Sequence, residues 1–321
     1  MAKIYITRNI PEEGLELLRE AGHTVIVSEK DGVLAKEELV TALKKESYDA
    51  VLCTLSDTID EKVMDAAPGA KIFANFAVGY DNIDMSAAKE RGVTVTNTPD
   101  ALTDAVAEHT FALMLALARR IPESDRFIRA GKYTGWGPML LLGVLLKGKT
   151  LALVGMGRIG SRVAELAACF GMHIAYCDTK RNEKLEQKMH AEWCDTPEAL
   201  FERADFISLH VPLLETTRHL INAERLARMK KTAFLINTSR GGVIDEEALV
   251  RALQNGVIRG AALDVFEHEP ALAPGLTEFE NVVLTPHTAS ATEEARASMS
   301  RIAAGNILAH LRGETPNNIV T

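Results

Sequence analysis

The segment Val154-Gly155-Met156-Gly157-Arg158-Ile159-Gly160 holds three glycines at the spacing G-x-G-x-x-G. An apolar run, Leu151 to Val154, precedes the glycines, and a stretch rich in alanine and leucine follows them. In a strand–turn–helix unit the first glycine permits the tight turn, the second lets backbone amides approach a pyrophosphate, and the third lets helix and strand pack closely. Glycines are common in turns, but the strand before and the helix after these three predict a dinucleotide-binding loop.

An acidic residue stands at the end of the next predicted strand. Asp178 follows the apolar run His173 to Cys177, about 20 residues beyond the glycines, where a ribose-binding acid is expected. Its carboxylate repels a 2'-phosphate, so NAD is favoured over NADP. Lys180 and Arg181 follow directly and could tolerate that phosphate, which leaves NADP as an alternative.

Short apolar runs alternate with helical patterns in two series along the chain. The first series has runs at 3–7, 23–27, 50–53, 71–74 and 93–96. The second has runs at 151–154, 173–177, 205–209, 233–237, 260–263 and 282–284. Such alternation implies parallel sheets covered by helices on both faces. We therefore expect an α/β chain with two doubly wound parallel-sheet domains, and a length of 321 residues agrees with two domains.

A long helical pattern covers residues 103–130. Its apolar stripe is too broad for one surface helix, so we expect burial between domains or across the interface of a homodimer. The turn-rich segment Tyr133 to Pro138 and the apolar, poorly patterned segment Met139 to Leu146 follow, before a new strand begins near Lys149.

The composition excludes several classes of partner. A net charge of -8 without a basic stripe argues against nucleic acid or an anionic membrane as a partner. No apolar run approaches the ~20 residues of a membrane span, and the N-terminus has a strand pattern rather than that of a signal sequence, so we expect a cytoplasmic protein. No metal site is predicted, and reduced thiols are expected at the four cysteines, Cys53, Cys169, Cys177 and Cys194.

Three polar residues follow apolar runs of the second series. Arg240 offers a planar, permanently charged fork that can hold a carboxylate or polarise a carbonyl. His287 can exchange a proton near neutral pH, and Glu269 beside it would favour the imidazolium and fix the tautomer. Each residue alone is more often a surface or core residue. Together with a dinucleotide motif they predict hydride transfer to or from an anionic carbonyl compound.

The chain resembles the D-isomer-specific 2-hydroxyacid dehydrogenases over essentially its whole length. The matching segments occur in the family's order: residues 75–84, Asn97-Thr98-Pro99, residues 106–109, residues 155–160, His210-Val211-Pro212, residues 237–246, residues 263–267 and Pro286-His287. The segments 97–104 and Gly135-Trp136-Gly137-Pro138 resemble the glyoxylate and hydroxypyruvate reductase branch most. The chain departs from the common pattern after His287, where it has Thr288-Ala289-Ser290.

This resemblance implies a domain plan and a set of site residues. A flavodoxin-like substrate domain, residues 1–98 completed by 289–321, would receive a Rossmann cofactor domain, residues 99–288, with a dimerisation helix at 103–130. The implied catalytic residues are Arg240, Glu269 and His287. The implied substrate contacts are Val78, Gly79, Arg240, Ser290 and, from the neighbouring subunit, Trp136. The implied cofactor contacts are Thr103, Gly155, Met156, Gly157, Arg158, Ile159, Gly160, Asp178, Val211, Pro212, Thr238, Ser239 and Asp264.

The substrate expected from the resemblance is a small 2-oxo or 2-hydroxy acid of D configuration, with glyoxylate or hydroxypyruvate reduction favoured. Exposed amides at Val78 and Gly79 could bind its carboxylate. D-lactate or 3-phosphoglycerate as substrate, and phosphite oxidation on the same scaffold, stay open. An alternative of another class is an NAD(H)-sensing corepressor, for which the long C-terminal tail is missing.

Overall fold

The computed structural model describes residues 1–30 and 32–320, which form two compact units. Unit 1 comprises Met1–Leu102 and Ala291–Thr321, and unit 2 comprises Thr103–Ser290. Unit 2 is thus inserted into the chain of unit 1. The expected domain junctions at 98/99 and 288/289 differ from these boundaries by a few residues.

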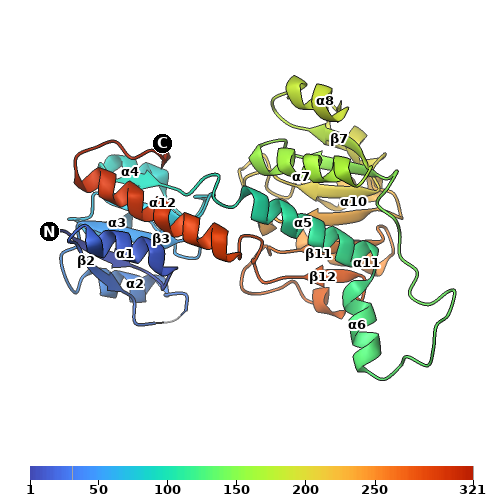
Figure 1. Cartoon of the computed structure of the whole chain (residues 1–321), viewed down its shortest axis with the longest axis horizontal. Coiled ribbons are helices and arrows are strands. Elements are labelled where there is room, and N and C mark those ends of the chain that lie inside the picture. The colour runs from blue at the N-terminus through green and yellow to red at the C-terminus, as the bar shows by residue number, and fades with distance from the viewer. Residues whose placement is uncertain (31, 321) are drawn as a thin grey trace. The chain divides into compact units, whose positions relative to one another are not determined.

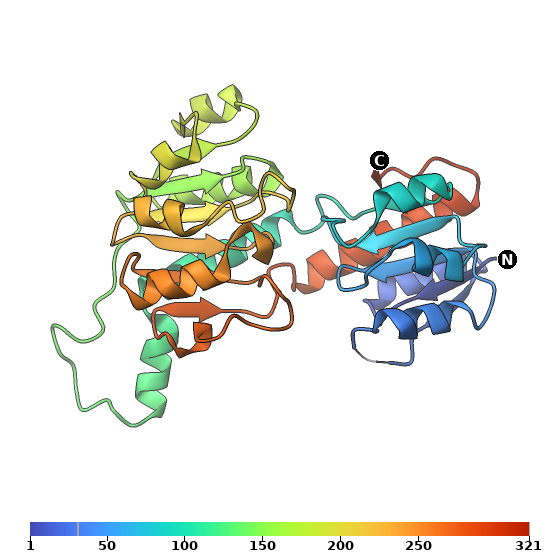
Figure 2. The ribbon, with the colours of Figure 1, turned by 180° about the vertical axis from the view of Figure 1, so that it is seen from behind.

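Unit 1 is an α/β unit, with a six-stranded sheet that has helices on both faces (Figures 1 and 2). Its strands are β1 (Lys3–Ile6), β2 (Thr24–Val27), β3 (Ala50–Thr54), β4 (Ile72–Phe76), β5 (Thr94–Thr96) and β13 (Ile319–Val320). Its helices are α1 (Glu12–Glu20), α2 (Lys36–Leu43), α3 (Glu61–Ala66), α4 (Met85–Glu90) and α12 (Glu293–Leu311). The strand order β13-β5-β4-β3-β1-β2, with only β13 antiparallel, contains the flavodoxin-like order and confirms the predicted class.

The C-terminal helix α12 returns to unit 1 and packs on α1. Gly14 lies where the two helices meet, and an ideal Cβ on it would lie 2.3 Å from Ser300 Oγ. The Ser300 hydroxyl accepts a hydrogen bond from the Gly14 amide at 3.0 Å and donates one to the Pro11 carbonyl at 2.6 Å. Glycine at position 14 therefore permits the close approach that completes this unit.

Unit 2 is a seven-stranded parallel sheet. Its strands are β6 (Thr150–Val154), β7 (His173–Cys177), β8 (Glu192–Trp193), β9 (Phe206–Leu209), β10 (Phe234–Asn237), β11 (Gly260–Leu263) and β12 (Val282–Leu284). Its helices are α5 (Thr103–Ala118), α6 (Ile121–Arg129), α7 (Arg158–Cys169), α8 (Glu183–Met189), α9 (Pro197–Phe201), α10 (Ala223–Arg228) and α11 (Glu246–Gln254), with 3-10 turns at Gly241–Val243 and Leu276–Glu278. The strand order β12-β11-β10-β9-β6-β7-β8 is that of a Rossmann sheet.

Successive residues of β6 enter two different cores, because side chains alternate across a strand. Leu151 and Leu153 pack in the core under α5 and α7. Ala152 and Val154 pack in the core under α9, α10 and α11. The sheet is thus buried on both faces, which explains why its strands appear in the sequence as continuous apolar runs.

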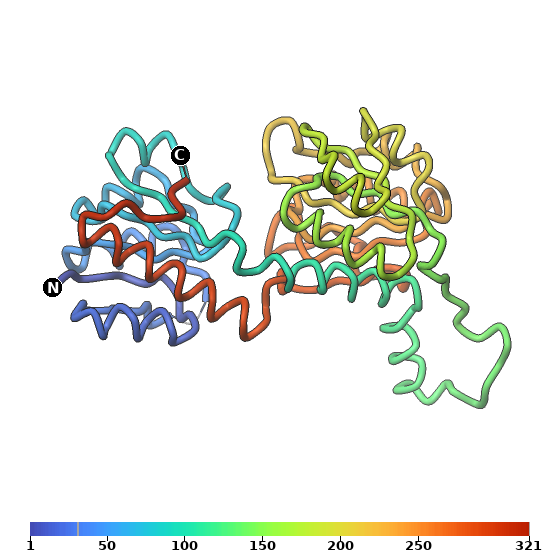
Figure 3. Tube along the Cα trace, turned by 45° about the horizontal axis from the view of Figure 1, so that its top comes forward, coloured from blue at the N-terminus to red at the C-terminus, as the bar shows by residue number. Residues whose placement is uncertain are grey.

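The prediction of a single helix at 103–130 is wrong. The structure has two helices there, α5 and α6. The break lies at Arg120, whose φ of +54° is left-handed and cannot continue a right-handed helix. Pro122 then occupies the first turn of α6, where a missing N–H costs no hydrogen bond. After α6 the chain runs out from the body of unit 2 as an extended segment before it returns to β6 (Figure 3).

No helix in the described part of the chain is long and apolar enough to cross a bilayer. All four cysteines are free thiols in the structure. Residues 1–30 and 32–320 contain no cluster of three or more metal-ligating side chains.

Candidate active site

The glycine loop between β6 and α7 has the geometry that a pyrophosphate-binding loop requires. Gly155 has a φ of +95°, a left-handed conformation that glycine adopts readily. An ideal Cβ on Gly155 would lie 2.5 Å from the carbonyl oxygen of His210, and one on Gly160 would lie 2.1 Å from the carbonyl oxygen of Gly155. A Cβ on Gly157 would meet no atom within 4 Å. The first and third glycines of the loop pack against protein backbone, whereas space remains free beside the second, where a pyrophosphate would lie. These residues therefore fit a dinucleotide.

The amino end of α7 and the Asp178 carboxylate lie beside this loop. α7 begins at Arg158, and the first amides of a helix have no partner within it, so they can bind phosphate oxygens. Asp178 follows β7, and its Oδ2 accepts a hydrogen bond of 2.6 Å from the Met156 amide. The predicted ribose-binding acid is therefore adjacent to the predicted phosphate-binding loop.

The other predicted cofactor contacts in unit 2 lie near the carboxyl ends of its strands or at the start of α5. Val211 and Pro212 follow β9, Thr238 and Ser239 follow β10, Asp264 follows β11, and Thr103 begins α5. β6 and β9 are neighbours in the sheet although β7 and β8 separate them in sequence. The strand order reverses at this point, which is where ligands bind in open α/β sheets.

His210 closes the inner side of the glycine loop at this reversal. Its ring Nε2 lies 2.9 Å from Ser208 Oγ. Burial lowers the pKa of His210 to about 4, so its imidazole is neutral at physiological pH. His210 is therefore poorly suited to donate a proton in a reaction near neutral pH.

His287 and Glu269 form a hydrogen-bonded pair. His287 Nδ1 lies 2.9 Å from Glu269 Oε2, and the other carboxylate oxygen accepts a bond of 3.0 Å from the Phe266 amide. His287 lies in the turn after β12 with a φ of +53°, a conformation that costs about 1–2 kcal/mol for a residue with a Cβ. The turn is held because the His287 amide donates to the Asp264 carbonyl at 2.8 Å.

The Glu269 carboxylate determines which nitrogen of His287 exchanges protons. Burial alone would raise the pKa of Glu269, but the hydrogen bond and charge of His287, the Phe266 amide and the charge of Arg240 together lower it. An ionised carboxylate only accepts hydrogen bonds, so the hydrogen-bond network assigns the proton of this contact to His287 Nδ1. Nε2 is then the ring nitrogen that can exchange a proton with a substrate.

Arg240 is held at the end of β10 by Asn237. The buried Asn237 side chain donates from Nδ2 to the Arg240 carbonyl at 2.9 Å. Its Oδ1 accepts from the Ser239 amide at 3.0 Å and from the Ser239 hydroxyl at 2.7 Å. Asn237 therefore fixes the backbone of the segment that presents Arg240.

Gly241 lets the Arg240 segment approach the segment that carries Glu269. An ideal Cβ on Gly241 would lie 2.0 Å from the carbonyl oxygen of Phe266, so any side chain would push the two segments apart. This approach agrees with the effect of the Arg240 charge on the Glu269 pKa. Unit 2 thus brings together the three predicted catalytic residues.

Asp264 anchors the turn that carries His287. Its fully buried carboxylate accepts at Oδ1 from Thr285 Oγ1 at 2.6 Å and from the Thr288 amide at 2.8 Å. Its Oδ2 accepts from the Ala289 amide at 2.8 Å. Both oxygens of this predicted cofactor contact are therefore bonded to the turn.

We expect Asp264→Asn to lower the free energy of unfolding at pH 7 by about 1–3 kcal/mol, because one buried N–H donor would then face another. Burial would raise the pKa of Asp264, but hydrogen bonds from His109 and the turn lower it overall. A lowered folded-state pKa gives stability that is present above the unfolded-state value and lost as pH falls through the folded-state value. The difference between the variant and the wild type should therefore be full above about pH 4 and shrink as pH falls below that value towards the lowered folded-state pKa.

Urea denaturation between pH 3 and pH 8 measures this difference. Asp125→Asn is the control, because Asp125 is exposed and pairs with Arg129 on α6, an ion pair that contributes little to stability. Equal stabilities of the Asp264 variant and the wild type at pH 7 would contradict the anchoring role.

Comparison with known proteins agrees with this geometry. Residues 111–289 match the model of the D-isomer specific 2-hydroxyacid dehydrogenase NAD binding domain. A glyoxylate reductase of Thermofilum pendens is 51% identical, over 99% of this chain and 94% of that protein.

The chain belongs to the D-isomer specific 2-hydroxyacid dehydrogenase family. Solved structures agree with this membership. The TT0316 protein from Thermus thermophilus is 42% identical with a TM-score of 0.91, over 99% of this chain and 100% of that one. An NADPH-dependent glyoxylate/hydroxypyruvate reductase from Sinorhizobium meliloti, in complex with NADP and malonate, is 34% identical with a TM-score of 0.87, over 100% of this chain and 97% of that one.

The predicted substrate contacts of this dehydrogenase are distributed over both units. Val78 and Gly79 follow β4 in unit 1. Ser290 is buried and is the last residue of unit 2. Trp136 lies in the extended segment after α6 and is 83% exposed.

Several residues that shape this dehydrogenase's site were not among the predicted site residues. Asn237 and Gly241 belong to the motif around Arg240, but only the structure shows which groups they contact. His109 on α5 lies beneath the His287 turn, with Nε2 3.1 Å from Thr285 Oγ1. His109 is a polar residue inside an apolar helix and belongs to the segment 106–109 that resembles the family, but neither feature shows which group it contacts.

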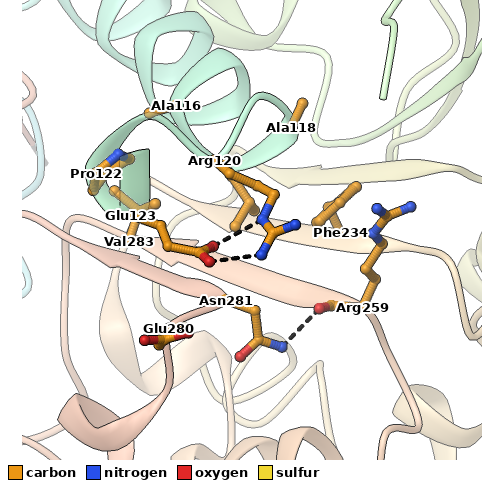
Figure 4. Close-up of a pocket in the computed structure, with 11 residues that line it drawn as sticks. Ala116, Ala118, Arg120, Pro122, Glu123, Phe234, Arg259, Glu280, Asn281 and Val283 are labelled. Carbon is orange, nitrogen blue, oxygen red and sulfur yellow. Dashed lines mark hydrogen bonds and ion pairs between the residues drawn. The ribbon is translucent and has the colours of Figure 1, made fainter. Parts of the chain in front are cut away.

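A cavity of about 300 Å³ lies in unit 2 at the opposite edge of the sheet from the catalytic residues (Figure 4). It is lined by Phe234, at the amino end of β10, and by Arg259 and Asn281, which precede β11 and β12. Arg120 and Glu123 also line it and form a paired hydrogen bond with each other, as Figure 4 shows. None of the predicted catalytic or cofactor residues lines this cavity, and we assign it no part in the reaction.

Proposed function

We propose that this dehydrogenase reduces a small 2-oxo acid, glyoxylate or hydroxypyruvate, to the 2-hydroxy acid, with D configuration where that carbon is a stereocentre. The observation that carries the proposal is the His287–Glu269 pair beside Arg240, at the sheet edge that also carries the dinucleotide loop. The names of the relatives support the substrate class, since the Thermofilum pendens protein is a glyoxylate reductase and the Sinorhizobium meliloti enzyme is named for both substrates.

In this proposal each residue has a separate task. The Gly155–Gly160 loop, the amino end of α7 and Asp178 would hold the dinucleotide, and the nicotinamide supplies the hydride when bound. Arg240 binds the substrate carboxylate or polarises the carbonyl with its fixed charge. As the carbonyl carbon gains a hydride, its oxygen takes the proton from Nε2 of the His287 imidazolium. Glu269 stabilises that imidazolium and keeps the ring orientation through Nδ1.

Initial rates with a panel of oxo acids test the substrate. We expect glyoxylate or hydroxypyruvate to give a higher kcat/KM than pyruvate or phosphohydroxypyruvate. Selectivity for one additional methylene is worth only ~1–3 kcal/mol, so the preference should be about tenfold to a few hundredfold. The substrate assignment is wrong if the wild type reduces neither of the two.

We propose that NADH is the preferred cofactor, with NADPH as a slower alternative. Asp178 lies beside the loop with its carboxylate ready to accept from ribose hydroxyls. Arg181, which could bind a 2'-phosphate, instead forms an ion pair with Glu186 and lies over the Trp193 ring. The similarity to the NADPH-dependent enzyme of Sinorhizobium meliloti supports NADPH as the slower alternative cofactor.

Replacing Asp178 with alanine should therefore lower kcat/KM for NADH by about 10–100-fold, because hydrogen bonds to a charged group are worth roughly 1.5–3 kcal/mol. The value for NADPH should stay constant or rise, since a repulsive charge is removed. Steady-state kinetics with both cofactors measure the ratio, and Asp125→Ala on α6 is the control. A variant that keeps the wild-type ratio would contradict this role of Asp178.

We propose that the enzyme is a homodimer held by the extended segment after α6. Large apolar side chains on that segment face solvent, among them Trp136 at 83%, Met139 at 77% and Leu145 at 70% exposure. A soluble protein rarely leaves such a group uncovered, and a second copy of the same segment offers the matching apolar surface. The family likeness supports the further proposal that Trp136 borders the active site of the neighbouring subunit.

Sedimentation equilibrium should find the wild type as a dimer at micromolar concentration. Trp136→Ala should weaken the dimer by about 2 kcal/mol or more, roughly 30-fold in Kd, as expected for a buried aromatic at an interface. Tyr48→Phe, a conservative change in the core of unit 1, is the control. A wild type that sediments as a monomer would refute the dimer.

A further inference from the structure

Three successive carbonyl groups of the loop after β4 are bonded to the framework of unit 1. The Thr98 amide donates to the carbonyl of Ala77 at 2.8 Å. The side chain of Asn97 donates from Nδ2 to the carbonyl of Val78 at 2.8 Å. The side chain of Asn75 donates from Nδ2 to the carbonyl of Gly79 at 2.9 Å. Two of the three donors are thus asparagine side chains that hold this loop.

The direction of each carbonyl fixes the direction of the next amide. In a trans peptide the C=O and the N–H of the same plane point in opposite directions. Because the Val78 carbonyl faces Asn97, the Gly79 N–H faces away from the framework. Because the Gly79 carbonyl faces Asn75, the Tyr80 N–H also faces away from the framework.

These amides are available to a ligand. Within residues 1–30 and 32–320, the N–H groups of Val78, Gly79 and Tyr80 donate no hydrogen bond. Val78 and Gly79 are half-buried and Tyr80 is exposed, so solvent or a ligand can reach them. A row of outward N–H groups is a neutral receptor for an anion such as a carboxylate.

The framework behind Asn75 is rigid. Asn75 is fully buried, and its Nδ2 also donates to Asn82 Oδ1 at 3.1 Å. Asn82 Nδ2 in turn donates to the carbonyls of Thr54 at 3.1 Å and Asp57 at 3.0 Å. This chain of bonds leaves the Asn75 side chain one orientation, with its N–H₂ group toward Gly79.

We propose that Asn75 and Asn97 are positioning residues that keep the amides of Gly79 and Tyr80 turned outward as the receptor for the substrate carboxylate. The inference rests on the proposed function, in which the substrate is a 2-oxo acid, and on the family resemblance, which implies that Val78 and Gly79 contact that substrate. Neither asparagine touches the substrate. Without its asparagine donor a peptide plane can rotate and present a carbonyl oxygen, which repels the carboxylate.

Three variants test this role: Asn97→Ala and Asn75→Ser, which remove the donor, and Asn97→Asp, which puts an acceptor opposite the Val78 carbonyl. We expect KM for glyoxylate and the inhibition constant of oxamate to rise together by about tenfold to a hundredfold, with Asn97→Asp the largest. kcat should change only a few-fold, and the Kd of NADH, followed by its fluorescence, should not change. Because Asn97 is only half-buried, Asn97→Ala gives a test even if Asn75→Ser fails to fold.

Asn306→Ala is the matched control. Asn306 is buried and donates to the carbonyl of Asn97 at 3.3 Å, so its loss disturbs the same segment but frees no carbonyl of the loop. The inference would be overturned if Asn97→Ala left KM and oxamate inhibition unchanged, or if Asn306→Ala changed them as much as Asn97→Ala does. Neither result would contradict the proposed function. A wild type that reduces no oxo acid would overturn the proposed function and this inference with it.

Discussion

His287→Ala should lower kcat for the reduction of hydroxypyruvate with NADH by about 10²–10⁴-fold, the usual worth of a positioned general acid. The structure gives the reason, because Glu269 occupies Nδ1 and leaves Nε2 as the nitrogen that can protonate the carbonyl oxygen. Steady-state kinetics at saturating substrate measure kcat. The Kd of NADH should be unchanged, since the dinucleotide loop lies on other segments.

His173→Ala is the control for this variant. His173 is exposed at the amino end of β7, at the edge of the sheet opposite the catalytic residues, so its removal should leave kcat within a few-fold of the wild type. An His287→Ala enzyme that retains a tenth or more of the wild-type kcat would exclude His287 as the proton donor.

Arg240→Ala should lower kcat/KM by about 10³-fold, because one residue supplies both charge and paired donors to the developing alkoxide or the carboxylate. Arg240→Lys should recover only part of this loss. A lysine keeps the positive charge but cannot reproduce the planar fork. Measuring kcat and KM separately shows which state Arg240 stabilises, since a loss confined to KM indicates binding that is equal in substrate and transition state.

Arg259→Ala is the matched control for Arg240. Arg259 lies in the same unit at the opposite edge of the sheet, with its guanidinium over the Phe234 ring, 5.4 Å from the centroid. It should leave kcat/KM nearly unchanged. If Arg240→Ala behaves like Arg259→Ala, the proposed anion-binding role is refuted.

The sheets could be predicted from the sequence because their strands are buried on both faces. Runs such as Leu151 to Val154 and Ile174 to Cys177 are apolar throughout, and the structure places strands there. Two strands could not be found in this way, β8 (Glu192–Trp193) and β13 (Ile319–Val320), since two residues give no pattern. The single helix expected at 103–130 overlooks Pro122, a residue that favours the first turn of a new helix and marks the break at Arg120.

The chemistry of the site could be predicted only as far as residue type decides it. An arginine, a carboxylate and a histidine after successive strands already indicated acid–base chemistry on an anion. The hydrogen-bond partner of a polar side chain depends on the three-dimensional positions of the surrounding atoms, which cannot be read from residue types. The resemblance implies that Asp264 contacts the cofactor, but nothing in the residue pattern indicates that its oxygens hold the His287 turn, as they do in the structure.

In the proposed reaction a hydride passes directly from the cofactor to the carbonyl carbon of a 2-oxo acid, with His287 and Arg240 assisting the transfer. Incubation of the wild type with hydroxypyruvate and NADH deuterated at both C4 positions tests it most directly, with the product analysed by mass spectrometry and chiral chromatography. We predict D-glycerate that carries one deuterium at C2. Glycerate without deuterium, or L-glycerate, would contradict the proposed reaction.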